Sequence, residues 1–301
     1  MLIGISGKIG SGKDTVGNII QYLTALKKYP DIQPSYEEFS KLTQKEINYN
    51  ASLDDSLSDF EIKKYADKLK DFICMLIGCT REQLEDQDFK NKVLPEEWWV
   101  YKVENFNDDE QYDIIGSYED RYELLDSHNL DVEEHNKLYG DSDPKMTEEE
   151  FNKDFLVKTT PRLLLQIIGT ECIRDKVHPN AWVNALFADY KYEIHRSEVP
   201  TRAAGFIDQH VYPNWIITDM RFPNEMEAVK SKGGITIRVN RSYDSLNQDS
   251  LFSLQKQQET NNHPSETSLD SATFDFVISN DKDIEHLINE VRKILEKLNI
   301  I

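Results

Sequence analysis

The sequence predicts an α/β protein whose mostly parallel sheet is covered by helices on both faces. Near the N-terminus, an apolar run at 2–6 is followed by a glycine-rich turn and then by apolar residues at helical spacing. The same order of strand and helix returns twice in the last third of the chain. Strands that alternate with helices form parallel sheets, because each connecting helix packs on a face of the sheet.

The elements of the N-terminal and middle regions follow from apolar spacing. Residues 2–6 predict a buried strand, and Thr15 to Leu26 predicts a helix. Three further helical patterns follow along the chain, and they cover Tyr65 to Ile77, Leu163 to Ile168 and Trp182 to Phe187. We expect Arg174 to lie beyond the end of the second of these helices.

The C-terminal region repeats the pattern of strand and helix. Strands are predicted at Trp215 to Thr218, Ile235 to Val239 and Phe274 to Ser279. Helices are predicted at Asn224 to Lys232, which stops before two glycines, and at Ile284 to Leu298. Asn280 and Asp281 are the expected caps of the last helix.

The charge is strongly negative and unevenly distributed. The chain carries 35 basic and 55 acidic residues, for a net charge of −20. Residues 104–155 alone hold 18 acidic and 4 basic residues, so we interpret them as an acidic insertion, part of which forms a short helix pair. A balance of this kind disfavours direct binding to nucleic acid or to an anionic membrane.

Cysteine usage and the absence of a leader pattern indicate a cytoplasmic protein. The three cysteines are an odd number without a C-x-x-C pattern, which predicts buried thiols in a reducing compartment. No basic leader precedes the first apolar run, and no segment has the roughly 18 apolar residues that a membrane span needs.

The glycine-rich turn carries the strongest functional signal. Residues 7–13 read GKIGSGK and fit the pattern G-x-x-x-x-G-K, directly after a predicted strand and before a predicted helix. Such a loop turns its backbone N–H groups around a phosphate, and the helix adds its positive dipole end. The residues expected to contact nucleotide phosphates are Gly7, Lys8, Gly10, Ser11, Gly12, Lys13, Asp14 and Thr15.

Asp14 departs from the usual form of this loop. A serine or threonine hydroxyl that ligates magnesium normally follows the lysine, whereas here Asp14 comes first and Thr15 second. Asp14 could approach the metal, serve as a base or substrate anchor, or simply place a charge at the helix N-terminus. The sequence leaves these alternatives open.

A second carboxylate is expected at the same edge of the sheet. Asp219 directly follows the predicted strand at Trp215 to Thr218, at the end of the strand where ligands of parallel sheets bind. It could reach the magnesium shell or a substrate hydroxyl, or cap a helix instead. Arg221 could point the same way and neutralise charge during phosphoryl transfer, or form a surface ion pair.

Other candidate substrate contacts lie on the middle helices. Arg162 and Gln166 are four residues apart and therefore share a helix face. Arg174 and Lys70 are further cations near apolar segments, although lone cations on helices usually face solvent. Trp182 could stack on a base or belong to the core.

Four motifs together resemble the phage-type deoxynucleoside monophosphate kinases. They are GKIGSGKDT at 7–15, TPRLLLQIIGTE at 160–171 with Arg174 and Trp182 after it, TDMRFPNE at 218–225 and ISNDKDIEHL at 278–287. The resemblance covers residues 1–80 and 159–301. An aspartate after the loop lysine is typical of this group.

The resemblance implies a P-loop kinase fold and transfer of the terminal phosphoryl of ATP to a deoxynucleoside monophosphate, with Mg²⁺. By motif position it implies catalytic roles for Lys13, Asp14, Thr15 and Arg221, and metal binding by Asp14 and Asp219. The residues that it implies for substrate binding are Arg162, Gln166, Arg174, Trp182, Asp219, Arg221 and Glu225, and we add Lys70 from its position among the middle helices. Some relatives carry two adjacent arginines where this chain has Arg162 and Leu163, which puts the grip on phosphate and the base preference in doubt.

A single kinase domain over 1–301 is expected from this resemblance. Within it we place a helical substrate-binding part at 15–80 and 156–200, the acidic insertion at 104–155 and a lid-like segment at 240–264. The partner would be the monophosphate substrate, with a homodimer left open, and the setting the cytoplasm, that of the host if the protein is phage-encoded. Two alternatives stay open, namely another small-molecule kinase, such as a dephospho-coenzyme A kinase-like protein, and a nucleotide-binding interaction protein without catalysis.

Overall fold

The computed structural model describes residues 1–301 except 33, 105–111, 141, 199–205 and 243–266. The chain divides into two compact units, which are described separately. The first unit combines Met1–Lys68 with Val177–Ile301, and the second unit is Leu69–Lys176. The lid-like segment expected at 240–264 lies almost entirely outside the described residues.

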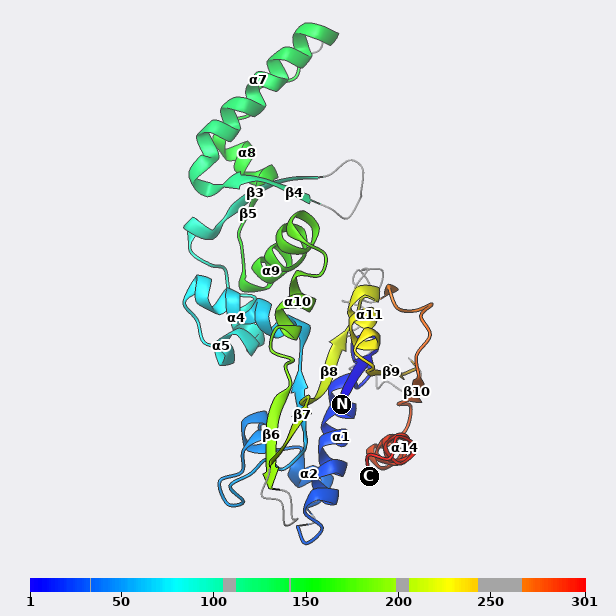
Figure 1. Cartoon of the computed structure of the whole chain (residues 1–301). Coiled ribbons are helices and arrows are strands. Elements are labelled where there is room, and N and C mark those ends of the chain that lie inside the picture. The colour runs from blue at the N-terminus through cyan, green and yellow to red at the C-terminus, as the bar shows by residue number, and fades with distance from the viewer. Residues whose placement is uncertain (33, 105–111, 141, 199–205, 243–266) are drawn as a thin grey trace. The chain divides into compact units, whose positions relative to one another are not determined.

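A five-stranded parallel sheet forms the centre of the first unit (Figure 1). Its strand order is β10-β9-β1-β8-β2, and every neighbouring pair is parallel. The strands are β1 (Leu2–Ser6), β2 (Phe60–Lys63), β8 (Asn214–Met220), β9 (Ile235–Asn240) and β10 (Phe276–Ser279). The predicted fold class is therefore confirmed, although β2 was not among the predicted strands.

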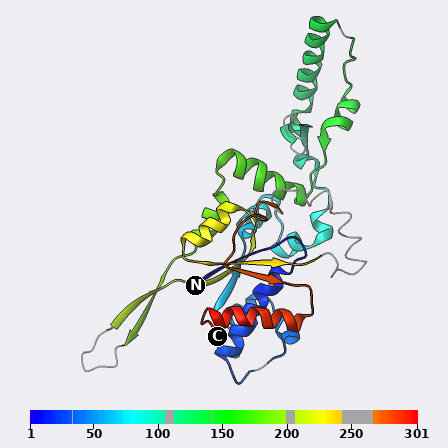
Figure 2. The same ribbon diagram turned by 90° about the vertical axis from the view of Figure 1, so that its right-hand side faces the viewer.

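Helices cover both faces of this sheet because its strands are apolar on both sides. The main helices of the unit are α1 (Lys13–Lys28), α10 (Ala181–Phe187), α11 (Pro223–Ser231) and α14 (Ile284–Lys297). On β8, Ile216 packs in the cluster that contains α1 and α14, whereas Trp215 and Ile217 pack with α10 and α11. Figure 2 shows α14 in red beside α1 in blue, with α11 in yellow on the other side of the sheet.

The residue that caps the start of the last helix, α14, differs from the prediction. Asp283, not Asn280 or Asp281, caps α14, because its carboxylate accepts a hydrogen bond from the backbone N–H of His286 at 2.9 Å. Asp281 instead accepts hydrogen bonds from the backbone N–H and the hydroxyl of Ser242. Residues 280 and 281 lie between β10 and the cap residue Asp283. Their side chains form hydrogen bonds with other loops, Asn280 with Ser11 and Asp281 with Ser242.

Smaller elements of the first unit were not predicted from the sequence. They are the short helices α2 (Tyr36–Phe39) and α3 (Gln44–Asn48), and an antiparallel pair of strands, β6 (Glu193–Glu198) and β7 (Phe206–Val211). Each short helix begins with a capping box, in which Ser35 pairs with Glu38 and Thr43 with Glu46.

The second unit is built from short helices and a small antiparallel sheet of order β4-β3-β5. Its strands are β3 (Val100–Glu104), β4 (Tyr112–Ser117) and β5 (Leu156–Val157). Its helical elements are α4 (Tyr65–Ile77, from Leu69 on), α5 (Arg81–Glu85), α6 (Gln87–Lys90), η1 (Glu96–Trp98), η2 (Tyr118–Asp120), α7 (Arg121–Tyr139), α8 (Glu148–Phe155), α9 (Pro161–Gln166) and η3 (Ile167–Val177). Helices α7 and α8 form within the acidic segment, where a short helix pair was expected.

Two predictions about the second unit were wrong. Arg174 does not follow a helix end, because a π-helical stretch, η3, continues directly from α9 and contains it. The thiols are not buried, since Cys172 is exposed and Cys74 and Cys79 are only half-buried. The buried core of this unit is instead made by Ile73, Leu84 and Leu164.

Candidate functional site

The glycine-rich loop (Gly7–Lys13) connects β1 to α1 and has a backbone that only glycine suits. Gly10 and Gly12 have φ angles of 76° and 95°, in the left-handed region that side chains disfavour. At Gly7 an added Cβ would lie 2.4 Å from the hydroxyl of Ser11 and 2.5 Å from the carbonyl oxygen of Val239. The loop therefore has the close-packed, glycine-dependent form that the motif requires.

Contacts from distant residues hold this loop in place. The side-chain amide of Asn280, after β10, donates to the carbonyl oxygen of Ser11 at 2.9 Å. The ammonium of Lys13 folds back and donates to the carbonyl oxygen of Lys8 at 3.0 Å. The hydroxyl of Ser11 is buried without a hydrogen-bond partner among the described residues. A buried orphan hydroxyl beside a lysine and a helix N-terminus fits an anionic ligand.

Lys8 is paired with a carboxylate beside the loop. Its ammonium lies 3.1 Å from Asp270, which also binds the guanidinium of Arg238 on β9 at 2.5 Å. Arg238 is 9% exposed, and its other Nη donates to the hydroxyl of Ser6 at 3.1 Å. The phosphate contact expected of Lys8 stays a prediction, since such a contact would have to compete with Asp270.

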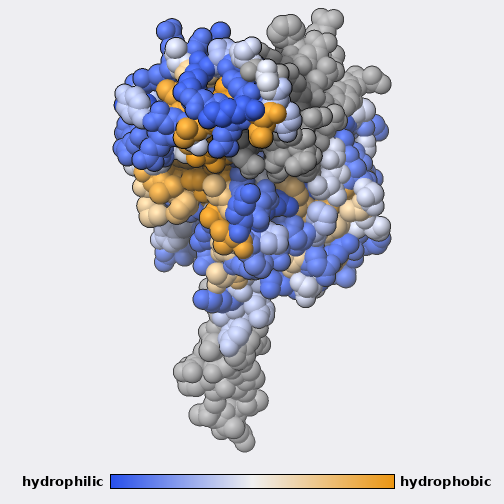
Figure 3. All heavy atoms as spheres, turned by 90° about the horizontal axis from the view of Figure 1, so that it is seen from above, coloured by the Kyte–Doolittle hydropathy of each residue, from blue (hydrophilic) through white to orange (hydrophobic). Residues whose placement is uncertain are grey.

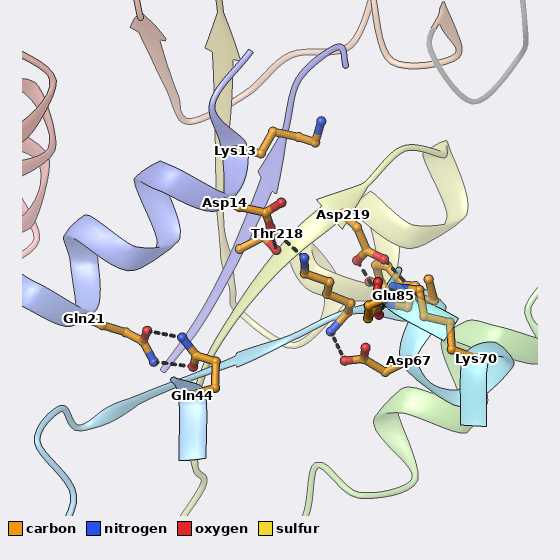
Figure 4. A network of polar contacts seen from close by, with 12 residues as sticks. Lys13, Asp14, Gln21, Gln44, Asp67, Lys70, Glu85, Thr218 and Asp219 are labelled. Carbon is orange, nitrogen blue, oxygen red and sulfur yellow. Dashed lines mark hydrogen bonds and ion pairs between the residues drawn. The ribbon is translucent and has the colours of Figure 1, made fainter. Parts of the chain in front are cut away.

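Asp14 is held by residues from two other elements (Figure 4). Its Oδ1 accepts a hydrogen bond from the hydroxyl of Thr218 on β8 at 2.6 Å, and it lies 2.9 Å from the ammonium of Lys64. Partial burial raises the pKa of Asp14, but the hydrogen bond from Thr218 and the charges of Lys64 and Lys13 outweigh it and lower the pKa. Asp14 is therefore an anion at neutral pH.

Asp219 caps the helix that follows β2. Its two carboxylate oxygens accept the backbone N–H groups of Tyr65 at 2.8 Å and of Ala66 at 3.0 Å, at the start of α4. Burial raises the pKa of this carboxyl, and the two backbone hydrogen bonds and the charges of Lys64 and Arg221 oppose that rise. The helix-cap alternative is thus realised, while a role in binding metal or substrate stays a prediction.

Glu225 fixes the backbone from which Arg221 extends. Its Oε2 accepts the backbone N–H groups of Arg221 at 2.6 Å and of Phe222 at 3.0 Å, ahead of α11. Glu225 is buried, and Arg221 is half-buried. Residues 219–225 fit the pattern D-x-R-x-x-x-E. The carboxylates of Asp219 and Glu225 both accept hydrogen bonds from backbone N–H groups, and Arg221 lies between them in the sequence.

Comparisons with known proteins identify the family of this chain. A family model described as deoxynucleotide monophosphate kinase matches residues 1–291. The chain belongs to this family. A protein of Acanthamoeba polyphaga mimivirus named "Putative deoxynucleotide monophosphate kinase" is 25% identical over 156 residues, which cover 52% of this chain and 69% of the viral protein.

The second unit of this family member holds four of the predicted substrate contacts. The guanidinium of Arg162 donates to the side-chain oxygens of Asn91 at 2.9 Å and of Gln87 at 2.8 Å. Both partners are neutral amides, so they orient the guanidinium without cancelling its charge. Gln166 is exposed on the same helix, and Arg174 is half-buried on η3.

Lys70 is the fourth of these contacts, and it is paired with Glu85 at 2.6 Å. Burial raises the pKa of Glu85, but Lys70 and Lys90 together lower it to about 2. The predicted contacts of the first unit, from Gly7 to Thr15 with Asp219, Arg221 and Glu225, lie around the ends of β1 and β8.

Trp182, on α10, is half-buried. It does not belong to the buried apolar clusters found among the described residues, in contrast to its neighbour Val183. Its position leaves both base stacking and a partial packing role open.

Three residues at this candidate site were missed by the sequence analysis. Lys64, Thr218 and Asn280 all contact the loop or Asp14. Asn280 lay within a quoted motif and Thr218 within a predicted strand, so position alone could have flagged them. Lys64 follows the short polar sequence FEIK, which gave no clear strand signal.

No cluster of three or more metal-binding side chains exists within the described part of the chain. Magnesium sites in phosphoryl-transfer enzymes rely on one or two carboxylates together with substrate phosphates and water, so Asp14 and its surroundings fit this type of site.

Among the described residues, no helix is both long and apolar enough to span a membrane.

Proposed function

We propose that this protein transfers the terminal phosphoryl group of ATP to a deoxynucleoside monophosphate, producing the diphosphate and ADP. The observation that carries the proposal is the glycine-rich loop, with left-handed Gly10 and Gly12 and no space for a side chain at Gly7. Membership of the deoxynucleotide monophosphate kinase family supports the acceptor class. The name of the viral relative points the same way.

The loop would bind the phosphates of ATP. Backbone N–H groups of residues 10–15 would donate to the phosphate oxygens, and the orphan hydroxyl of Ser11 would gain a partner. Lys13 would exchange the carbonyl oxygen of Lys8 for a phosphate oxygen, because a charged acceptor forms the stronger hydrogen bond.

Asp14 would hold Mg²⁺, directly or through a water molecule. It remains ionised at neutral pH, and magnesium prefers carboxylate and water oxygens. Asp219 would take part through water, because each of its oxygens already accepts a backbone N–H. A magnesium ion held by Asp14 would supply positive charge that neutralises the nucleotide phosphates.

The acceptor monophosphate would be bound by cations. Arg162, Arg174, Arg221 and Lys70 are the proposed phosphate contacts, and Gln166 and Trp182 the proposed base contacts. The neutral partners of Arg162 support this role, since the charge of its guanidinium remains available to an anion. Catalysis would consist of positioning and charge neutralisation, with little covalent chemistry for the protein.

The test is incubation of the purified protein with ATP, Mg²⁺ and each common deoxynucleoside or ribonucleoside monophosphate. Ion-exchange chromatography would follow the diphosphate that forms. Formation of a deoxynucleoside diphosphate by the wild type, and its loss in a Lys13→Ala protein prepared in parallel, is expected. ATP binding without turnover of any monophosphate would exclude the proposal and favour a nucleotide-binding interaction protein. Turnover of another acceptor would favour a different small-molecule kinase.

A further inference from the structure

We propose that Lys64 is a positioning residue for phosphoryl transfer, which acts by holding the carboxylate of Asp14 in a single orientation together with Thr218. Nothing in the sequence motifs singles out Lys64, and the inference rests on the proposed function. It concerns only residues of the first unit.

The geometry at Asp14 supports this role. The ammonium of Lys64 and the hydroxyl of Thr218 both contact Oδ1 of Asp14, at 2.9 and 2.6 Å. Two contacts on one oxygen fix the rotation of the carboxylate and leave the lone pairs of Oδ2 available. Figure 4 shows Asp14 lying between Lys13 and Thr218, close to the loop lysine.

Lys64 is itself held in place by the strand pairing before it and by backbone hydrogen bonds at and after it. In the pairing of β2 with β8, Lys63 lies opposite Ile217, so Lys64 comes beside Thr218 at the same edge of the sheet. The backbone N–H of Lys64 donates to Asp67 at 3.0 Å, and the next two N–H groups donate to Asp219. A lysine with a fixed backbone and a half-buried side chain loses little entropy when it forms an ion pair.

The charges around Lys64 favour the same conclusion. The ammonium of Lys64 lies 2.9 Å from Asp14, and the negative charges of Asp219 and Asp67 also act on it. Asp14 is the one in direct contact, and the other cation near Asp14 is Lys13, its neighbour in the sequence. Lys13 is also the lysine proposed to bind phosphate, so Lys64 can hold Asp14 while Lys13 is engaged with the nucleotide.

Lys63 provides a matched control. It precedes Lys64 and carries the same charge, but its ammonium pairs with Glu61 at 2.5 Å and lies 5.2 Å from the centre of the Trp215 ring. None of these contacts reaches the loop.

The experiment is a double-mutant cycle with Lys64→Met, Asp14→Asn and the double variant, alongside Lys64→Arg and Lys63→Met. We expect Lys64→Met to lower kcat by about 10-fold, with KM for the monophosphate changed less than about threefold, because a misplaced carboxylate affects the transition state more than substrate binding. Lys64→Arg should restore most of kcat, and Lys63→Met should leave it within about twofold of wild type. In the Asp14→Asn background, Lys64→Met should cause no further loss.

An equal loss with and without Asp14, or no loss at all, would overturn the inference. Melting temperatures of all variants would identify a variant that merely fails to fold, and if this is Lys64→Met, Lys64→Gln replaces it in the cycle.

Failure of the proposed function gives a different result, since the wild type would then form no diphosphate. In that case the same cycle is measured as the Kd of a fluorescent ATP analogue in the presence of Mg²⁺. Weaker binding on Lys64→Met that depends on Asp14 would support the positioning role, and additive effects would overturn it.

Discussion

The glycine-rich loop and helix α7 show opposite ways of using polar residues. Around the loop, buried or half-buried polar groups contact one another. They come from β1, β8 and β9, from Lys64 after β2 and from Asn280 after β10. Helix α7, by contrast, has no buried residue along its 19 positions, and exposed pairs such as His135 and Asp143 accompany it. In Figure 3, hydrophilic residues in blue predominate on the face in view, and hydrophobic ones in orange are scattered among them.

This difference teaches where functional residues are to be sought. The largest concentration of charge, at 104–155, coincides with the part of the chain that has few buried contacts. The loop has few charges, but Lys8 and the adjoining Asp14 contact partners distant in the sequence. Polar contacts between distant segments are therefore a better guide to the site than charge density, and the variants below compare the two regions.

Lys13→Ala is expected to have the largest effect on activity. Removal of one cation that contacts the reacting phosphates should lower kcat by about 100- to 1000-fold. The melting temperature should change little, because Lys13 donates a hydrogen bond to a carbonyl oxygen at the surface of the protein. Lys137→Ala on α7 is the matched control, and steady-state kinetics of both proteins would show whether charge loss matters only at the loop.

Asp219→Ala should destabilise the protein strongly. It leaves the backbone N–H groups of Tyr65 and Ala66 without their acceptor, at a cost of about 2 kcal/mol in the free energy of unfolding. Asp120→Ala removes a similar carboxylate, exposed before α7, and should destabilise the protein clearly less than Asp219→Ala does. Urea unfolding measures both, and equal losses would contradict the contrast drawn here.

Glu85→Gln should change the acid stability of the second unit. The pKa of Glu85 is lowered to about 2 from an ordinary value of 4.5, so its ion pairs stabilise the folded state above pH 4.5 and lose this effect as the pH falls toward 2. Because the side chain is 47% exposed, the effect should stay below about 1 kcal/mol. Unfolding at pH 5 and pH 3 should show a smaller difference for the variant than for wild type.

Glu133→Gln on α7 should have the smallest effect of all. Its ion pair with Lys145 is exposed at both ends, and solvent screens such pairs so that they contribute little to stability. Activity should equal that of wild type. A loss of kcat in this variant would show that the acidic segment takes part in the reaction.

The sheet of the first unit could be predicted because its strands and helices carry continuous apolar patterns. β1 was predicted at its observed bounds, and α11, β9 and α14 to within one residue at each end. The glycine-rich loop was also visible, since its motif is local. In these cases neighbouring residues alone carry the information.

The rest depended on contacts that no local pattern contains. Lys64 meets Asp14 only because β2 pairs with β8 in one particular register. The π-helical turn at Ile167–Val177 reads in the sequence as an ordinary helix end. The strands β3 to β7 are short or polar, and they alternate too weakly to be distinguished from loops.

The hydrogen bond between Asn280 and Ser11 has a consequence for biosynthesis. The two residues are 269 positions apart, and β1 lies between strands that are translated long after it. Contacts of such long range slow folding, because the connecting chain must be closed before they can form. On the ribosome, this hydrogen bond to the glycine-rich loop therefore cannot form until the chain has been made as far as Asn280. A nascent chain released earlier would carry the loop without this contact.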